Sequence, residues 1–256
     1  MTSPIGSLAW TRAGGGVLTA AESRTLFKEV LLAQLTLIPE EWLHKLSLRR
    51  AAAVPPDLDA LTPPDSALAR AAESACRNLS PEYLFNHCAR SYAWGRIFGA
   101  QLGLKPDPEL LYLAAMYHDM GLTETHGGAQ GRPACFSLIG ADVAAQAMTA
   151  AEYSARAIDT VCEAITLHLN IGVDLAYGPE AHLLNLATAV DTTGLRLWRM
   201  PKAAIGAVLA RHPRCNQNEL ICACWKAEAA RFPQTRAGWL EKNVQFSGRL
   251  RKAPLR

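Results

Sequence analysis

From about Ser66 onward, the apolar residues of this chain recur three and four positions apart, and alternating strand patterns are nearly absent. This spacing places apolar side chains on one face of a helix, whereas a strand needs a period of two. Asp107-Pro108-Glu109 combines an N-cap residue, a first-turn proline and an acidic residue, which marks the start of a helix. Gly103 and Gly121 mark helix ends. The sequence therefore predicts an all-α fold.

A proline-rich stretch divides the chain into two parts. Val54–Pro64 holds four prolines and two aspartates, which is typical of a linker or surface loop. Residues 1–65 are expected to form a lead-in and a helical extension, and Thr19-Ala-Ala-Glu22 in this part is a capping-box signature. Residues 66–256 are expected to form the main helical domain with C-terminal helices. Helices in it are expected near Ser137–Ala150, Tyr153–Leu169, Pro179–Thr192, Lys202–Arg211 and Asn218–Arg231.

Composition excludes several classes of protein. Apolar residues make up 50% of the chain and charged residues 19%, which supports a packed core and argues against disorder. The net charge of +3 predicts no nucleic-acid partner. No apolar run is long enough to span a membrane, and no signal peptide is visible. The seven cysteines are odd in number and lie mostly within apolar helical patterns, so we expect reduced thiols and a cytoplasmic location.

The adjacent pair His118-Asp119 ends an apolar helix, and three further residues could join it in a metal site. His87 lies 31 residues before His118, His168 follows about 50 residues later, and Asp191 lies in a later helix. Imidazole nitrogens and carboxylate oxygens bind divalent cations, and three or four such ligands leave a position open for water. Any one of these histidines is more often a surface or core residue, but the set together favours a metal centre.

Asp191 gives the most discriminating part of this argument. It falls late in an apolar helix, so its carboxylate is expected to be buried. A buried carboxylate is costly unless a cation, a metal ion or several hydrogen-bond donors surround it. The sequence alone leaves these three explanations open.

The chain resembles the HD-domain superfamily of metal-dependent hydrolases, whose defining pattern matches the spacing His87…His118-Asp119…Asp191. The local sequences look most like the cyanamide hydratase-like branch, in the segments 80–92, 114–122, 139–142, 164–170 and 189–194. The resemblance covers about residues 75–200. It implies an HD-domain helical bundle with N- and C-terminal helical extensions, in which His87, His118, Asp119 and Asp191 bind the metal. His168 would then lie beside the open coordination position.

Two departures from the family pattern bear on the chemistry. Dinuclear relatives carry an extra histidine four residues before a Gly-Ala pair, and this chain has Phe136 there. The resemblance therefore implies one divalent ion, with zinc favoured and iron, manganese and nickel as alternatives. Relatives of the hydratase type read Arg-Phe-Glu where this chain has Cys135-Phe136-Ser137, so an acidic group near the pocket is missing and the substrate stays open.

The resemblance implies an enzyme that adds water to a nitrile or cyanamide-like C–N group of a small molecule. His168 is expected to be the acid/base, with a pKa near neutrality, and Asp119 is the second catalytic candidate. Candidate substrate-binding residues are Asn170, Phe136, Tyr83 and Arg90. Asn170 could instead be an exposed loop residue, and Arg90 could instead pair with a carboxylate.

Two other functions stay open from the sequence. The first is a phosphohydrolase acting on a nucleotide or small phosphoester, which usually needs several cations beside the metal. Only Arg90, Arg96 and Arg132 lie near the metal residues, and no lysine lies between Lys105 and Lys202. The second is a non-catalytic HD-fold module that binds or regulates. A homo-oligomer is also compatible with the sequence, with Leu26–Leu35 as an interface helix.

Overall fold

The computed structural model describes residues 3–45, 61–127 and 134–255. Within these ranges the chain is helical and contains no β-strand beyond one isolated bridge between Val17 and Thr235, so the predicted all-α fold is confirmed. The helices are α1 (Leu8–Gly14), α2 (Ala20–Lys45), α3 (Ala67–Leu79), α4 (Glu82–Leu102), α5 (Pro108–Tyr117), α6 (Phe136–Ala150), α7 (Ala155–Leu167), α8 (Pro179–Thr193), α9 (Lys202–Arg211), α10 (Gln217–Arg231), α11 (Arg236–Val244) and α12 (Phe246–Arg251).

The predicted helix ends agree with the structure to within two residues for α6 to α10. A side-chain cap at Ser154 marks the start of α7, and Gly194 marks the end of α8. Asp107 caps α5 as expected, since its side chain accepts from the N–H groups of Glu109 and Leu110. The Thr19–Glu22 capping box also forms, because each side chain accepts a hydrogen bond from the other residue's backbone N–H. The linker predicted at Val54–Pro64 lies largely outside the described residues.

The core of the molecule is built around α4, which is buried on nearly all sides along its first 18 residues. A helix with polar and charged side chains in its buried face needs partners for them inside the protein. The helix packs most extensively against α8 and also contacts α5, while α6 and α7 pack against each other beside them. Trp94 and Phe98 of α4 are fully buried at this junction. The helices α4 to α8 therefore form the bundle that carries the candidate site.

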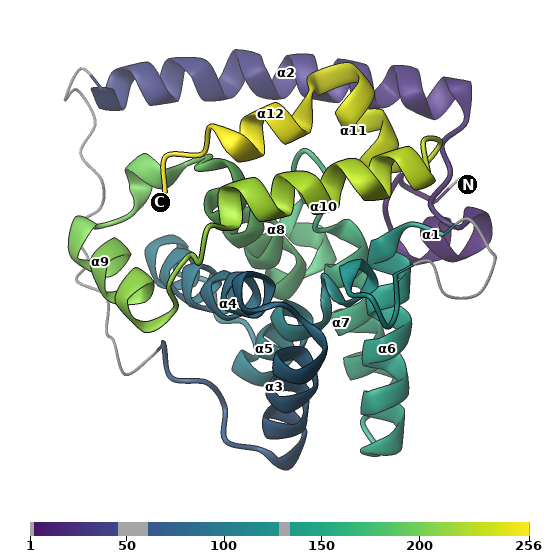
Figure 1. Cartoon of the computed structure of the whole chain (residues 1–256), viewed down its shortest axis with the longest axis vertical. Helices are drawn as coiled ribbons and strands as arrows, with labels where there is room; N and C mark the ends of the chain where they lie inside the picture. The colour runs from purple at the N-terminus through teal and green to yellow at the C-terminus, as the bar shows by residue number, and fades with distance from the viewer. Residues whose placement is uncertain (1–2, 46–60, 128–133, 256) are drawn as a thin grey trace.

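The N-terminal extension runs along one side of the molecule (Figure 1). Two tryptophans fix the start of α2. The indole N–H of Trp10 donates to Glu22, and that of Trp239 in α11 donates to Ser23. The face of α2 that carries Phe27, Leu31 and Leu35 is exposed, whereas Leu26 is buried. Self-association through this helix stays a prediction.

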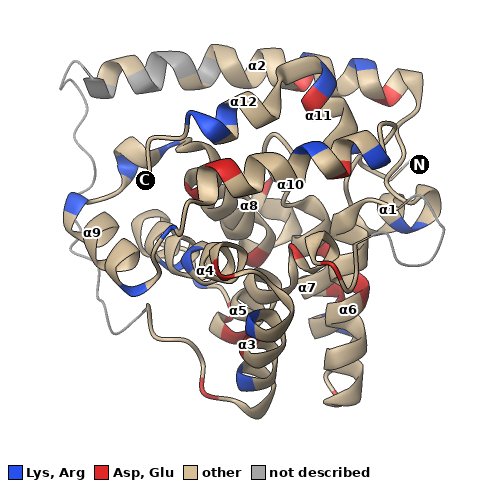
Figure 2. Cartoon of the chain, in the orientation of Figure 1, with Lys and Arg blue, Asp and Glu red and all other residues tan. Residues whose placement is uncertain are grey.

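The C-terminal helices α10, α11 and α12 lie between α2 and the α4–α8 bundle (Figure 1). Lys and Arg are spread over several helices, with Asp and Glu between them (Figure 2). Such mixing does not suggest a polyanion-binding surface, and the expected lack of a nucleic-acid partner stays a prediction. Across the described ranges, every helix is too short or too polar to cross a membrane.

Candidate metal centre

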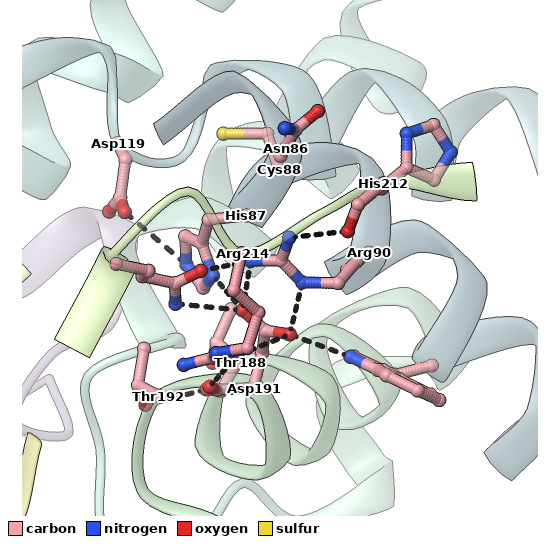
Figure 3. Close-up of polar contacts among 12 residues, drawn as sticks. Asn86, His87, Cys88, Arg90, Asp119, Thr188, Asp191, Thr192, His212 and Arg214 are labelled. Carbon is pink, nitrogen blue, oxygen red and sulfur yellow. Dashed lines mark hydrogen bonds and ion pairs between the residues drawn. The ribbon is translucent and has the colours of Figure 1, made fainter. Parts of the chain in front are cut away.

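Three side chains from two helices converge in the interior of the bundle. His87 projects from the second turn of α4, His118 follows the last residue of α5, and Asp119 comes next in the chain. The Nε2 atoms of His87 and His118 are 3.1 Å apart, and Oδ2 of Asp119 lies 3.4 Å from each of them. All three residues are buried. Figure 3 shows the carboxylate of Asp119 pointing toward the His87 ring.

The hydrogen-bond partners of the ring Nδ1 atoms determine where each histidine carries its proton. Nδ1 of His118 lies 2.8 Å from the carbonyl oxygen of Ala115, and Nδ1 of His87 lies 2.7 Å from a carboxylate oxygen of Asp191. Both oxygens accept hydrogen bonds, so both Nδ1 atoms carry the hydrogen. With one hydrogen on each ring, at Nδ1, the Nε2 atoms present lone pairs toward each other and toward Asp119. This concentration of acceptors calls for a cation.

The spacing of the three atoms fits a divalent metal ion. Ligand atoms about 2.1 Å from one ion lie about 3.0 Å apart at a right angle and roughly 3.4 Å apart in a tetrahedron. The observed separations of 3.1 to 3.4 Å fall in this range. His87, His118 and Asp119 also form the one group of His, Cys, Asp or Glu with metal-ligand spacing in the described part of the chain.

The backbone of α6 lies directly against the turn that carries His118 and Asp119. A Cβ atom on Gly121 would lie 2.2 Å from the carbonyl oxygen of Phe136, and one on Gly140 would lie 2.5 Å from that of Tyr117. Any side chain at either position would push the two segments apart. The glycines therefore fix the distance between the His-Asp turn and Phe136.

Asp191 is fully buried on the opposite side of the His87 ring, and donors occupy both of its oxygens. The guanidinium of Arg90 donates to Oδ1 at 2.7 Å and to Oδ2 at 3.0 Å. The indole N–H of Trp94 donates to Oδ1, and Nε2 of Gln217 and Nδ1 of His87 approach Oδ2. Arg214 adds a second guanidinium 3.5 Å from Oδ1. Figure 3 shows this network around the carboxylate.

The structure does not bring Asp191 into the group formed by His87, His118 and Asp119, and its role as a direct metal ligand stays a prediction. Of the three explanations for a buried carboxylate, the structure provides a cation and several donors. Burial alone would raise the pKa of Asp191, but Arg90 and the hydrogen bond from His87 hold it well below its usual range. In this arrangement Asp191 orients the His87 ring through the hydrogen bond at Nδ1.

Arg90 is likewise not placed for the predicted substrate contact. Its guanidinium is completely buried and also donates to the carbonyl oxygens of His212 and Pro213. The sequence alternative, in which Arg90 pairs with a carboxylate, is the observed one. Tyr83 also lies outside the pocket, because its hydroxyl is buried against Cys224.

His168 follows the last residue of α7 and faces the cluster from the pocket side. Its Nε2 lies 3.8 Å from Oδ1 of Asp119, and its Nδ1 lies 2.6 Å from the carbonyl oxygen of Ile165. Its Nε2 therefore presents a lone pair as well. Burial and the neighbouring His118 lower the pKa of His168 to about 3. This shift is away from the near-neutral pKa expected from the sequence, and it favours the neutral ring, in which Nε2 can accept a hydrogen bond. The acid/base role of His168 stays a prediction.

One pocket opens onto the cluster. It is lined by His87, His118, Asp119, His168, and the predicted residues Phe136 and Asn170. The ring of Phe136 meets that of His168 edge to face, with 5.7 Å between the centroids. The amide of Asn170 donates to the carbonyl oxygen of Ile5 and accepts from Arg236. Asn170 thus lines the pocket while its amide ties the N-terminal segment to α11.

Two buried charged residues near the site, Arg236 and Glu228, come from the C-terminal helices, and no local sequence pattern indicates them. Arg236 of α11 donates to Ser137, so the position where relatives carry an acid holds a serine bound to a cation. Glu228 of α10 is buried, and one of its oxygens has no hydrogen-bond partner. Burial raises the pKa of Glu228 to about 7, against smaller effects of Arg231 and the backbone of Phe136.

The described part of the chain is an all-α domain whose buried cluster could hold a metal ion. Residues 84–193 match the family model of the HD domain. The matched segment begins in α4 and ends with α8, and it contains all of His87, His118, Asp119, His168 and Asp191. HD domains are generally metal-dependent hydrolases. A comparison with curated proteins gives no match.

Proposed function

We propose that this protein is an enzyme that uses one divalent metal ion, with zinc favoured, to add water to a nitrile or cyanamide-like C–N group of a small molecule. The observation that carries the proposal is the convergence of His87, His118 and Asp119 at metal-ligand spacing on the wall of a pocket. A divalent ion held there supplies an electrophilic centre and a water molecule of lowered pKa.

The residues around this centre have separate tasks in the proposed reaction. Nε2 of His168 has a free lone pair on the pocket side, so it accepts a proton from the attacking water and returns it to the substrate nitrogen. The carbonyl oxygen of Ile165 holds the His168 ring in this orientation. Asp119 offers Oδ2 to the metal and keeps Oδ1 near His168. Phe136 packs on the imidazole and covers it from water.

The charge of the pocket favours an uncharged substrate over a phosphoester. Arg249, an exposed residue of α12, is the one Lys or Arg among the described residues that line the pocket. Arg90 and Arg214 are committed to Asp191 and lie behind His87. A phosphoryl group would need cations or several donors beside the metal to balance its charge. The phosphohydrolase alternative therefore has weaker support.

A non-catalytic HD module is the alternative from another class. Such a module has no need for an uncommitted imidazole lone pair beside the metal ligands. His168 provides one, and it faces a pocket large enough for a ligand. The arrangement therefore supports an enzyme.

The first test is the metal content of the purified, untagged protein by elemental mass spectrometry, with Asp119→Ala as the control. About one equivalent in the wild type and almost none in the variant is expected. The metal-replete protein is then incubated with nitriles, cyanamide and phosphoesters, and amide, urea or phosphate is measured. Phosphate release without amide or urea would replace the proposal with the phosphohydrolase function. Bound metal with no turnover of any substrate would favour the non-catalytic module.

A further inference from the structure

The pocket that opens onto the metal centre is much larger than the proposed reaction needs. It has a volume of about 190 Å³ and extends from His118 and Asp119 to α2 and α12. At about 30 Å³ for each water molecule in the liquid, it could hold roughly six water molecules. A nitrile group and one attacking water fill only a small part of this space. The remainder is available to the rest of the substrate.

The far part of the pocket is mostly apolar, with Gln34 of α2 and Arg249 of α12 as its polar residues. Its walls come from four helices outside the matched HD segment, namely α2, α10, α11 and α12. The side chains that they contribute include Val30, Leu37, Ile221, Trp225, Leu240 and Phe246. Water in such a space finds few hydrogen-bond partners, so an apolar group that displaces it gains free energy.

The polar side chains that α8 contributes to the pocket are already engaged within the protein. Thr188 donates to the carbonyl oxygen of Asn185, and Thr192 donates to that of Thr188. The amide of Asn185 donates to the carbonyl oxygens of His168 and Asn170. A polar substrate tail would therefore find few free donors along this wall. An apolar tail would leave these hydrogen bonds intact.

We propose that the substrate carries an apolar chain or ring of several carbons, seated between α2 and helices α10 to α12. Its reactive group then lies at the His118–Asp119 end of the pocket. This inference rests on the proposed function for the reactive group, but the apolar tail is argued from the pocket walls alone. According to this inference, the two terminal extensions select the substrate, and the residues of the segment that matches the HD family model carry out the reaction.

The test is the affinity of unbranched primary amides, from acetamide to decanamide, measured by isothermal titration calorimetry. These amides are the products of nitrile hydration and need no turnover to bind. Burying one methylene is expected to raise the affinity about fourfold, until the chain fills the pocket. An affinity that does not change with chain length in the wild-type protein would overturn the inference.

The same series on chelator-treated protein separates this inference from the proposed function. The gain with chain length should persist without metal, because the tail contacts α2 and α10 to α12 and not the metal ligands. Persistence in a protein that hydrates no nitrile would reject the reaction and retain the apolar pocket. A gain that vanishes with the metal would show that the walls do not bind the tail.

A matched pair of variants tests whether the apolar tail of the substrate lies beside α2. Val30 lines the pocket, whereas Leu32 is 62% exposed on the same helix and does not line it. Val30→Trp should weaken decanamide binding at least tenfold and leave acetamide binding unchanged, while Leu32→Trp should alter neither. Equal decanamide affinity in both variants would place the tail elsewhere and overturn the assignment. Circular dichroism checks that each variant is folded, and the wild-type series stands without them.

Discussion

The two sides of the His87 ring differ in how their acceptors are satisfied. On the Nδ1 side, the Asp191 carboxylate accepts hydrogen bonds from Arg90, Trp94 and Gln217. On the Nε2 side, lone pairs and a carboxylate face one another with no donor between them. Both sides use aspartate and histidine, so residue type does not distinguish the two sides. They differ in the number of hydrogen-bond donors around the aspartate.

Removing the Asp191 carboxylate, on the Nδ1 side of His87, is expected to have the largest effect on protein stability. Asp191→Ala leaves two buried guanidinium groups, of Arg90 and Arg214, without their negative partner. Breaking a buried ion pair in this way typically costs about 3–5 kcal/mol. We expect a large loss in urea-denaturation midpoint together with loss of metal binding. Unchanged stability would contradict the supporting role of Asp191.

Asp119→Ala tests the Nε2 side of His87. It should abolish metal binding and leave folding intact. Its carboxylate faces only imidazole nitrogens, so its loss removes a ligand and leaves no unpaired cation behind. We expect metal content to fall from about one equivalent to almost none, with a folded apoprotein. Adding metal should then raise the melting temperature of the wild type but not of the variant. Equal stabilisation of both by metal would mean that the site lies elsewhere.

His168→Ala should retain the metal and lose turnover, because His168 lies outside the three-residue group. Loss of a general base typically lowers the rate by about 10²–10⁴-fold. Since the pKa of His168 is about 3, the substitution should lower kcat by the same factor at every pH from 6 to 8. The measurement is kcat on the best substrate across this range, with metal content determined in parallel. Turnover equal to that of the wild type would remove His168 from the mechanism.

Glu228 is a buried carboxyl group that, unlike Asp191, has one oxygen without a hydrogen-bond partner. Its pKa of about 7 in the folded protein lies above the ordinary value of 4.5, so the folded state binds the proton more tightly. Its contribution to stability is therefore complete below about pH 4.5 and is lost as pH rises through 7. Glu228→Gln should raise stability at pH 8 by roughly 1–3 kcal/mol and have little effect at pH 5.

The measurement for Glu228 is urea denaturation at both pH values. Glu219→Gln, on the same helix, serves as the control: it removes an exposed ion pair with Arg251, which should change stability by less than about 1 kcal/mol at either pH. A gain of the same size at pH 5 and pH 8 would mean that ionisation of Glu228 is not its cause.

The sequence predicted the fold well because its signals are local. Asp107 and Gly103 act on their own helices, and apolar spacing identifies the buried face of each helix. The convergence of His87, His118 and Asp119 was also predicted, from residue chemistry and a family resemblance that the HD-domain match to residues 84–193 supports. The finer likeness to cyanamide hydratases stays part of the proposal.

The role of Asp191 could not be read from sequence because its partners lie far apart in the chain. Gln217 and Arg214 come from the segment that enters α10, and nothing in their spacing from Asp191 indicates contact. The pKa of His168 depends on burial by the whole bundle, which no motif encodes. Local patterns thus predicted which residues have the functional groups for metal binding or proton transfer. Tertiary packing determines which of these groups form hydrogen bonds with other side chains.

The close contact between α6 and the His-Asp turn has a practical consequence for altering this protein. Gly121 and Gly140 keep backbone against backbone, so a substitution at either would displace the metal ligands themselves. The apolar walls contributed by α2 and α10 to α12 lie on other segments and can be varied independently. A library built to change substrate preference should therefore randomise positions such as Val30, Leu240 and Phe246, and keep both glycines fixed.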